Sequence, residues 1–147
     1  EKMTTSTVTL ATIRSRVAVG RGDEGRAVWD DDALDEAIRR AVSDLGRYYG
    51  EPLLLSGLDS ASLTTLQKED ETALVTGAEF FAAFARIVDR LETPNFNEEA
   101  SMRFLDWTAT AGKRYAGLLG LIRLGRLQQS QNAPHAALEW NESAPQW

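Results

Sequence analysis

Apolar residues recur in alternating steps of four and three over 29–49, the spacing of one face of an α-helix. The members of this stripe are Leu34, Ile38, Ala41, Leu45 and Tyr48. Asp30 is placed as the N-cap, and acids follow it at the positive end of the helix dipole. Trp29 precedes the cap and is expected to pack on Leu34 as a hydrophobic staple. Because Gly50 and Pro52 end the pattern, the segment predicts one well-delimited amphipathic helix.

Two further helices are predicted on either side of it. The segment 7–19 predicts a short helix through Val8, Leu10, Ile13 and Val17. The segment 68–91 starts with three acids and carries the stripe Leu74, Gly77, Phe81, Phe84, Val88 and Leu91. Alanines and a glycine alternate there with phenylalanines, which indicates close packing between helices. Thr93 and Pro94 end this helix.

A last helix is expected from an N-cap at Asn97 to about residue 128. It would be ~30 residues and ~45 Å long, more than a compact four-helix domain of this size needs. Its first half is expected to bury Ala100, Phe104, Trp107, Ala111 and Tyr115. Its second half is mostly apolar but holds Gly117, Gly120 and Gly125, each costing about 1 kcal/mol relative to alanine. Either another helix packs closely on these glycines, or this half orders only against a partner.

Three connecting and terminal segments have the composition of loops. The glycine-rich segment 20–26 contains an Arg-Gly-Asp triplet, which we interpret as a chance tripeptide in a loop rather than an integrin ligand. The segment 51–65 is expected to be an ordered loop that is held by Leu53, Leu54, Leu55 and Leu58 and is available for contacts. The polar segment 129–147 carries Leu138, Trp140 and Trp147. These residues are expected either to anchor an arm on another chain or to fold back on their own domain.

The size of 147 residues fits one domain. We therefore predict an all-α fold, a four-helix bundle with a long C-terminal helix, comprising a helical domain at 3–128 and an extended C-terminal arm at 129–147. Met3 is taken as the native start. No apolar run approaches the ~18–20 residues that cross a bilayer. With no cysteine, disulfides and thiolate chemistry are excluded.

The net charge of −6 is unevenly distributed. Residues 51–102 hold ten acids against three bases, net −7, and residues 103–147 hold five bases against three acids, net +2. An acidic chain is poorly suited to wrap nucleic acid, because phosphate neutralisation needs clustered Lys and Arg. An acidic middle and a basic end favour contacts between subunits, with a merely solvated, uneven surface as the alternative.

Catalytic and metal-binding patterns are missing from the sequence. The single histidine, His135, has no second His or Cys at ligand spacing and no triad partners. Acid pairs such as Asp31 and Asp35 are better explained as helix caps than as cation ligands. No Rossmann, P-loop or kinase motif occurs. We expect no catalytic residue, no cofactor and no metal, and do not expect an enzyme.

Three segments together resemble one protein family. ATIRSRVAVG at 11–20, VWDDDALDEAIRRAVSDLGRYY at 28–49 and GAEFFAAFARIVDRL at 77–91 precede a long fourth helix with a trailing arm. This order resembles the head-to-tail connector proteins of tailed bacteriophages, the adaptors that dock beneath the portal. The resemblance implies an all-α bundle that assembles as a twelve-fold ring and extends the channel through which DNA leaves the capsid.

The resemblance also implies partners and a location. The partners are the portal protein, neighbouring copies of the chain and downstream neck or tail proteins, with DNA passing through the lumen without specific binding and no membrane. The location is the neck of the virion, after assembly in the host cytoplasm. Residues expected to bind the portal or a neighbouring subunit are Arg123, Arg126, Leu138, Trp140 and Trp147.

The basic C-terminal region supports one alternative function. In it, the chain is a small helical nucleic-acid-binding or packaging-regulatory module. The side chains that would face phosphate are Lys113, Arg114, Arg123 and Arg126. Affinity for DNA that falls as salt rises would distinguish this module from a structural adaptor.

Overall fold

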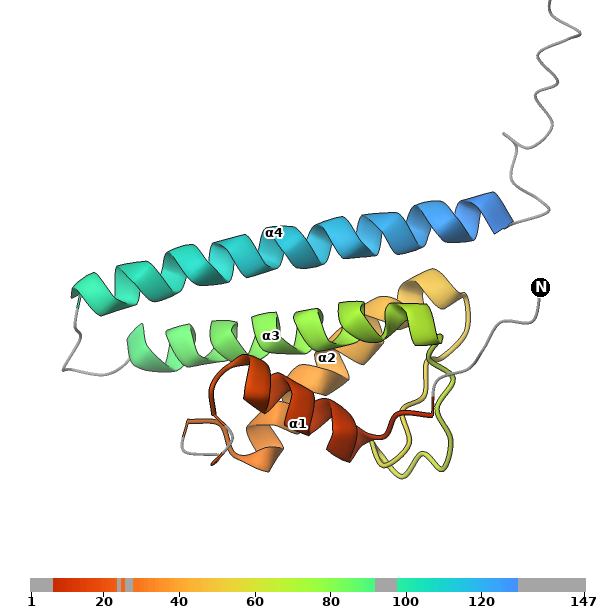
Figure 1. The fold of residues 1–147 in the computed structure, drawn as a ribbon, viewed down its shortest axis with the longest axis horizontal. Helices are drawn as coiled ribbons and strands as arrows, with labels where there is room; N and C mark the ends of the chain where they lie inside the picture. Colours follow the sequence, from red (N-terminus) through yellow and green to blue (C-terminus); the bar gives the residue numbers. More distant parts are fainter. Residues whose placement is uncertain (1–6, 24, 26–27, 92–97, 130–147) are drawn as a thin grey trace, which may run out of the picture.

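A computed structural model describes residues 7–23, 25, 28–91 and 98–129, and the regular elements within these ranges are all helical (Figure 1). They are α1 (Leu10–Gly20), α2 (Asp31–Tyr49), the short 3-10 helix η1 (Lys68–Asp70), α3 (Glu71–Leu91) and α4 (Glu98–Gln129). The predicted all-α, four-helix class is confirmed. Residues 130–147, which make up nearly all of the predicted arm, lie outside the described ranges.

Helix α2 begins and ends where its local signals predicted. The Asp30 side chain accepts a hydrogen bond from the backbone N–H of Ala33, with 2.8 Å between the two atoms. Gly50 ends the helix in the left-handed conformation, with φ of 71°. Its stripe is buried at Leu34, Ile38, Ala41 and Leu45, whereas Tyr48 is only half-buried. Trp29 joins the same core, and its indole N–H donates to the carbonyl oxygen of Ala82. The staple residue therefore also connects α2 to α3.

Helix α3 lies between the other three helices and contacts each of them. Its buried side chains are mostly small, including Ala73, Ala78, Ala82 and Ala83. Small side chains let the neighbouring helices approach closely. This corrects the predicted stripe, because Phe84 and Val88 are exposed rather than buried. In the C-terminal half of α3, Ala82, Ala83 and Ile87 are buried, and Phe84 and Val88 are left outside the core.

Helix α1 is joined to α2 by an ion pair and to the loop after α2 by backbone contacts. Arg14 donates to both carboxylate oxygens of Asp35, at 2.5 and 2.6 Å, and Asp31 lies 3.8 Å from the same guanidinium. Asp31 and Asp35, interpreted from the sequence as caps, thus also hold α1. The helix begins at Leu10, later than predicted, because Thr9 forms an isolated parallel bridge with Ser56.

The loop between α2 and η1 is ordered, as predicted from its leucines. Its buried anchors are Leu53, Leu55, Leu58 and Leu66. The backbone N–H of Thr65 donates to the carbonyl oxygen of Leu54 at 3.0 Å. The Thr64 hydroxyl donates to the carbonyl oxygen of Val8 at 2.7 Å and accepts from the backbone N–H of Ser56 at 3.0 Å. These bonds fix the loop against the start of α1.

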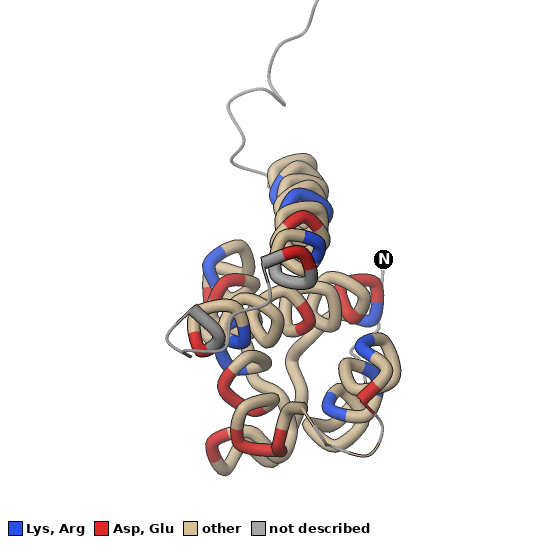
Figure 2. Tube along the Cα trace, turned by 90° about the vertical axis from the view of Figure 1, so that its left-hand side faces the viewer, with Lys and Arg blue, Asp and Glu red and all other residues tan. Residues whose placement is uncertain are grey.

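Helix α4 stands above the rest of the molecule in a layer of its own (Figure 2). It runs from Glu98 to Gln129, close to the predicted limits, and packs mainly on α3. Its inner side carries Phe104, Leu118, Leu119 and Ile122, which pack against the core, and the buried Tyr115. In the described part of the chain, no helix combines the length and apolar character that crossing a membrane requires.

Candidate interaction surface on the last helix

The C-terminal half of α4 exposes a stripe of apolar and small residues, which we call the α4 outer face. It consists of Gly117, Gly120, Leu121, Leu124 and Leu127. Residues three and four apart share one side of a helix, so these positions lie together. Leu121 is 66% exposed, Leu124 53% and Leu127 49%. Clustered exposed leucines of this kind are typical of surfaces that bind other proteins.

The glycines of this half are not used for packing within the chain. A β-carbon added at Gly117, Gly120 or Gly125 would meet no atom within 4 Å. Gly77 and Gly112 differ, because a β-carbon there would come within 2.6 Å of the Tyr115 ring and 3.0 Å of the Phe80 ring, respectively. Close contact between α3 and α4 therefore uses Gly77 and Gly112. The sequence left two roles open for Gly117, Gly120 and Gly125. Close packing by another helix of this chain is excluded within the described ranges.

The inner side of α4 is held by aromatic and polar contacts. The Tyr115 ring meets Phe81 edge-on, with 5.9 Å between centroids. Its hydroxyl donates to Asp44 of α2 at 3.3 Å. Burial, together with the nearby Asp44 carboxylate, raises the pKa of Tyr115 above its ordinary value. Tyr115 therefore stays neutral at ordinary pH and ties α4 to both α2 and α3.

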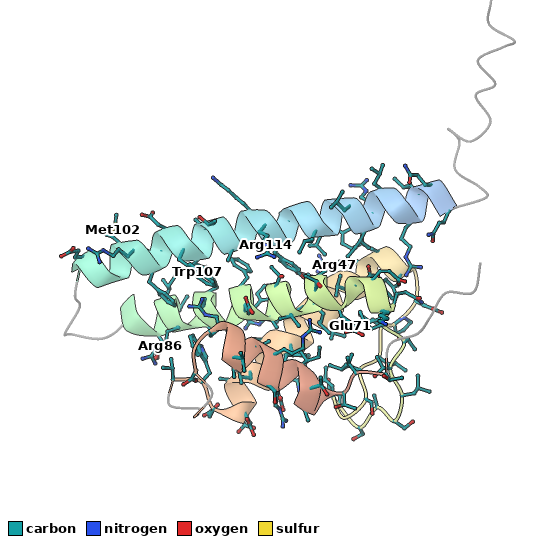
Figure 3. All side chains as sticks on the ribbon, viewed as in Figure 1. Arg47, Glu71, Arg86, Met102, Trp107 and Arg114 are labelled. Atoms are coloured by element: carbon teal, nitrogen blue, oxygen red, sulfur yellow. The ribbon has the colours of Figure 1, made fainter. Side chains whose placement is uncertain are left out.

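A second attachment is an arginine held among aromatic rings. The Arg21 guanidinium lies 3.5 Å from the Trp107 ring centroid, 5.6 Å from that of Trp29 and 5.9 Å from that of Phe104. Figure 3 places Trp107 on the inner side of α4 and Met102 on its outer side. Cation–π contacts of this kind contribute about 0.5–2 kcal/mol. The arginine of the Arg-Gly-Asp triplet thus connects the end of α1 to α4.

Arg21 is partly buried and interacts electrostatically with a half-buried acid, Glu79. Desolvation lowers the pKa of Arg21, against the attraction of Glu79. Desolvation also raises the pKa of Glu79 above 4.5, against the attraction of Arg21, Arg114 and Arg16. The folded protein consequently binds a proton at Glu79 more tightly than the unfolded chain does. Ionised Glu79 destabilises the fold above its raised pKa, and this penalty disappears as the pH falls to 4.5 and below.

Glu79→Gln is therefore expected to raise the free energy of unfolding modestly at pH 7. The variant carries no ionisable group at this position, so its advantage should shrink as the pH falls through the raised pKa of Glu79. Urea unfolding of both proteins across this pH range measures the difference. A variant that is less stable than the wild type at pH 7 would show that the attraction of Arg21 exceeds the desolvation cost.

The two described residues of the predicted binding set have different surroundings. Arg123 is exposed, as a partner-binding residue needs to be. Arg126 is half-buried, and its guanidinium lies 4.0 Å from the centroid of the Tyr49 ring. Arg126 is thus engaged within its own chain. The other three members, Leu138, Trp140 and Trp147, lie outside the described residues.

The C-terminal part of α4 is also uniformly basic. From 107 to 129 there are four cations and no acid, net +4; they are Lys113, Arg114, Arg123 and Arg126. Successive helix positions are about 100° apart, so these four side chains spread around the helix instead of lining one side. The most continuous feature of the outer side is therefore its leucines, with basic residues beside them.

A second exposed apolar surface lies on the loop after α2, and we call it the loop surface. It consists of Leu54, 40% exposed, and Leu63, 52% exposed, with the exposed acids Glu51 and Glu69. From the sequence, Leu54 was expected to hold the loop together with Leu53, Leu55 and Leu58, but it is exposed. The extended backbone alternates, with Leu53 and Leu55 inward and Leu54 outward, and this period of two was the signal that would have separated them.

Comparison with known proteins adds no relative. No family model matches the chain, and no match was found among curated proteins or solved structures. Within the described ranges, no group of three or more His, Asp or Glu side chains is arranged to hold a metal ion. The chemistry that these surfaces offer is apolar contact flanked by charge, which is suited to binding a protein.

Proposed function

We propose that this chain is a structural subunit of the head-to-tail connector type, a ring-forming adaptor beneath a phage portal. The observation that carries the proposal is the α4 outer face, an apolar stripe on a helix that packs on the rest of the chain through its other side. Together with the resemblance of 11–20, 28–49 and 77–91 to connector proteins, this stripe supports a role in assembly.

The exposed leucines give such an assembly a source of free energy. Fully burying one leucine side chain contributes roughly 1.5–3 kcal/mol. Leu121, Leu124 and Leu127 are each about half exposed or more, so covering all three contributes a few kcal/mol at each contact. In a ring the same contact is repeated around the axis, which stabilises the whole assembly.

The alternative of a nucleic-acid-binding module fits the arrangement of the basic residues less well. Arg126 is stacked on Tyr49, and Lys113, Arg114 and Arg123 point in different directions from one helix. Phosphate contacts need cations that follow the path of a backbone. A gel shift with duplex DNA tests this alternative, and retardation that weakens with rising salt would favour it over the adaptor.

Electron microscopy of the purified protein, with and without a candidate portal, tests the adaptor. Rings are expected, alone or on the portal. Deleting residues 130–147 should weaken docking while circular dichroism and thermal unfolding stay nearly unchanged, because Tyr115, Ile122 and Arg126 hold α4 without that segment. Docking that is equally tight without 130–147 would contradict the anchoring role of Leu138, Trp140 and Trp147. A protein that forms no ring under either condition would contradict the adaptor itself.

A further inference from the structure

We infer that the α4 outer face of one copy packs against the loop surface of the next copy, so that copies associate head to tail. The inference rests on the proposed assembly function and names the contact that would build it. It joins Leu121, Leu124 and Leu127 of one copy to Leu54 and Leu63 of its neighbour. The basic residues beside the first set face the acids of the second.

The C-terminal half of α4 and the loop that carries Leu54 and Leu63 lie at the same end of the molecule, with α2 and α3 between them. In Figure 1 the C-terminal half of α4 runs above α2 and α3, and the loop lies below them at the same end. Tyr49 connects the two regions: its ring lies under Arg126 of α4, and its hydroxyl donates to Asp70 and accepts from the backbone N–H of Gln67 at 3.1 Å. The Tyr49 contacts therefore fix the position of α4 relative to the segment that follows the loop.

The charges of the two regions are opposite. Residues 51–71 hold five acids against one base, net −4, whereas residues 107–129 hold four bases and no acid, net +4. Three of the five acids have partners within the chain: Asp59 pairs with Arg39, Glu71 with Arg16, and Asp70 accepts from Tyr49. The remaining two, Glu51 and Glu69, are exposed on the loop surface. An approaching α4 therefore meets an apolar surface flanked by acids.

Pairing of α4 with α4 in a symmetric dimer is the main competitor, and the same charges oppose it. Such a contact would place two 107–129 segments against each other, each with a net charge of +4 and no acid. Like charges at close range destabilise a contact, more strongly as water is removed. The loop surface of a neighbour offers leucines without this repulsion.

The backbone of the loop surface is held in one conformation by hydrogen bonds. The backbone on either side of Leu54 is held by the Thr65 and Ser56 hydrogen bonds, and Leu53 and Leu55 are buried. Asp59 and Ser60, with φ of 48° and 65°, are fixed where Arg39 holds Asp59 at 2.8 Å. Little conformational entropy is lost when a preformed surface is covered.

Two unlike surfaces at separate places on a subunit have a defined consequence for assembly. Each copy binds one neighbour with its α4 outer face and another with its loop surface. This heterologous contact continues until the rotation per copy closes a ring, or forms a filament if it does not close. A self-complementary α4 contact would instead stop at a dimer.

Cysteine cross-linking tests the contact, because the chain has no cysteine of its own. Leu63→Cys and Leu124→Cys are made singly and together, and each protein is oxidised under mild conditions after circular dichroism confirms its helix content. The double variant is expected to give a ladder of covalent oligomers on non-reducing gels, and a mixture of the two single variants should give mainly the mixed dimer. The double variant Val19→Cys, Leu124→Cys is the matched control, because Val19 is equally exposed but lies on α1, and it should give no ladder.

The outcomes separate the inference from the function on which it rests. A covalent dimer from Leu124→Cys alone would indicate α4 paired with α4 and overturn the inference. Wild-type rings without a ladder from the Leu63 and Leu124 pair would also overturn it, while leaving the adaptor function standing. A wild-type protein that stays monomeric in mass photometry, with and without a portal, would contradict the adaptor function as well.

Discussion

Leu124→Asp is expected to abolish self-association while leaving the helical domain folded. Leu124 lies at the centre of the α4 outer face and is 53% exposed in the single chain, so a carboxylate there stays hydrated and costs the monomer little. Covering the same carboxylate in a contact removes its water and costs several kcal/mol. Because each 1.4 kcal/mol is about tenfold in affinity, association should weaken at least about 100-fold. Mass photometry or light scattering after size-exclusion chromatography measures the change.

The matched control for this variant is Val19→Asp, which adds the same charge at an equally exposed apolar residue on α1. It should assemble like the wild type. If Leu124→Asp assembles as well as Val19→Asp does, the α4 outer face is not the contact, and the proposed adaptor loses the observation that carries it. Thermal unfolding of both variants should stay close to that of the wild type.

Gly77→Ala is expected to lower the free energy of unfolding by up to about 2 kcal/mol. A β-carbon at Gly77 would lie 2.6 Å from the buried Tyr115 ring, which is confined by Phe80 and Phe81. Overpacking of this kind costs about 1–3 kcal/mol, and the better helix propensity of alanine offsets about 1 kcal/mol of that. Urea unfolding monitored by circular dichroism measures the difference.

Gly117→Ala is the corresponding control on α4. A β-carbon there meets no atom within 4 Å, so the change should stabilise the isolated chain by up to about 1 kcal/mol through helix propensity. Opposite signs for Gly77→Ala and Gly117→Ala would confirm that α3 and α4 are in close contact at Gly77 and open at Gly117. A stable Gly77→Ala protein would show that Tyr115 moves aside without cost.

The attachments of α4 come from distant parts of the chain. Arg21 reaches it from the end of α1, Asp44 and Tyr49 reach it from α2, and Gly77 receives Tyr115 on α3. All these contacts are on the inner side of the helix. The outer leucines are therefore not needed to hold α4 on the rest of the chain, and substitutions on the α4 outer face are expected to leave the fold unchanged.

Local sequence signals predict all four helices and most of their limits, because these limits depend on neighbouring residues. The Asp30 cap and Gly50 set the ends of α2, and the long run of helix-compatible residues after 97 set the length of α4. These signals act over a few residues and need no knowledge of the rest of the chain. The glycines at 117, 120 and 125 likewise indicated from sequence alone that this half of α4 is unusual.

Which residues of each helix are covered depends on tertiary packing. Periodicity assigned Phe84 and Val88 to the core, but α3 is enclosed by three helices whose close approach admits alanines and leaves both larger side chains outside. The sequence placed Arg126 among the partner-binding residues, because nothing near it in the chain predicts a contact. In the structure its guanidinium covers the ring of Tyr49, which belongs to the distant helix α2. The loop surface arises in the same way, since Leu53 and Leu55 turn inward against the core and Leu54 is left outside. Burial depends on which elements meet in space, and that arrangement is not encoded in local spacing.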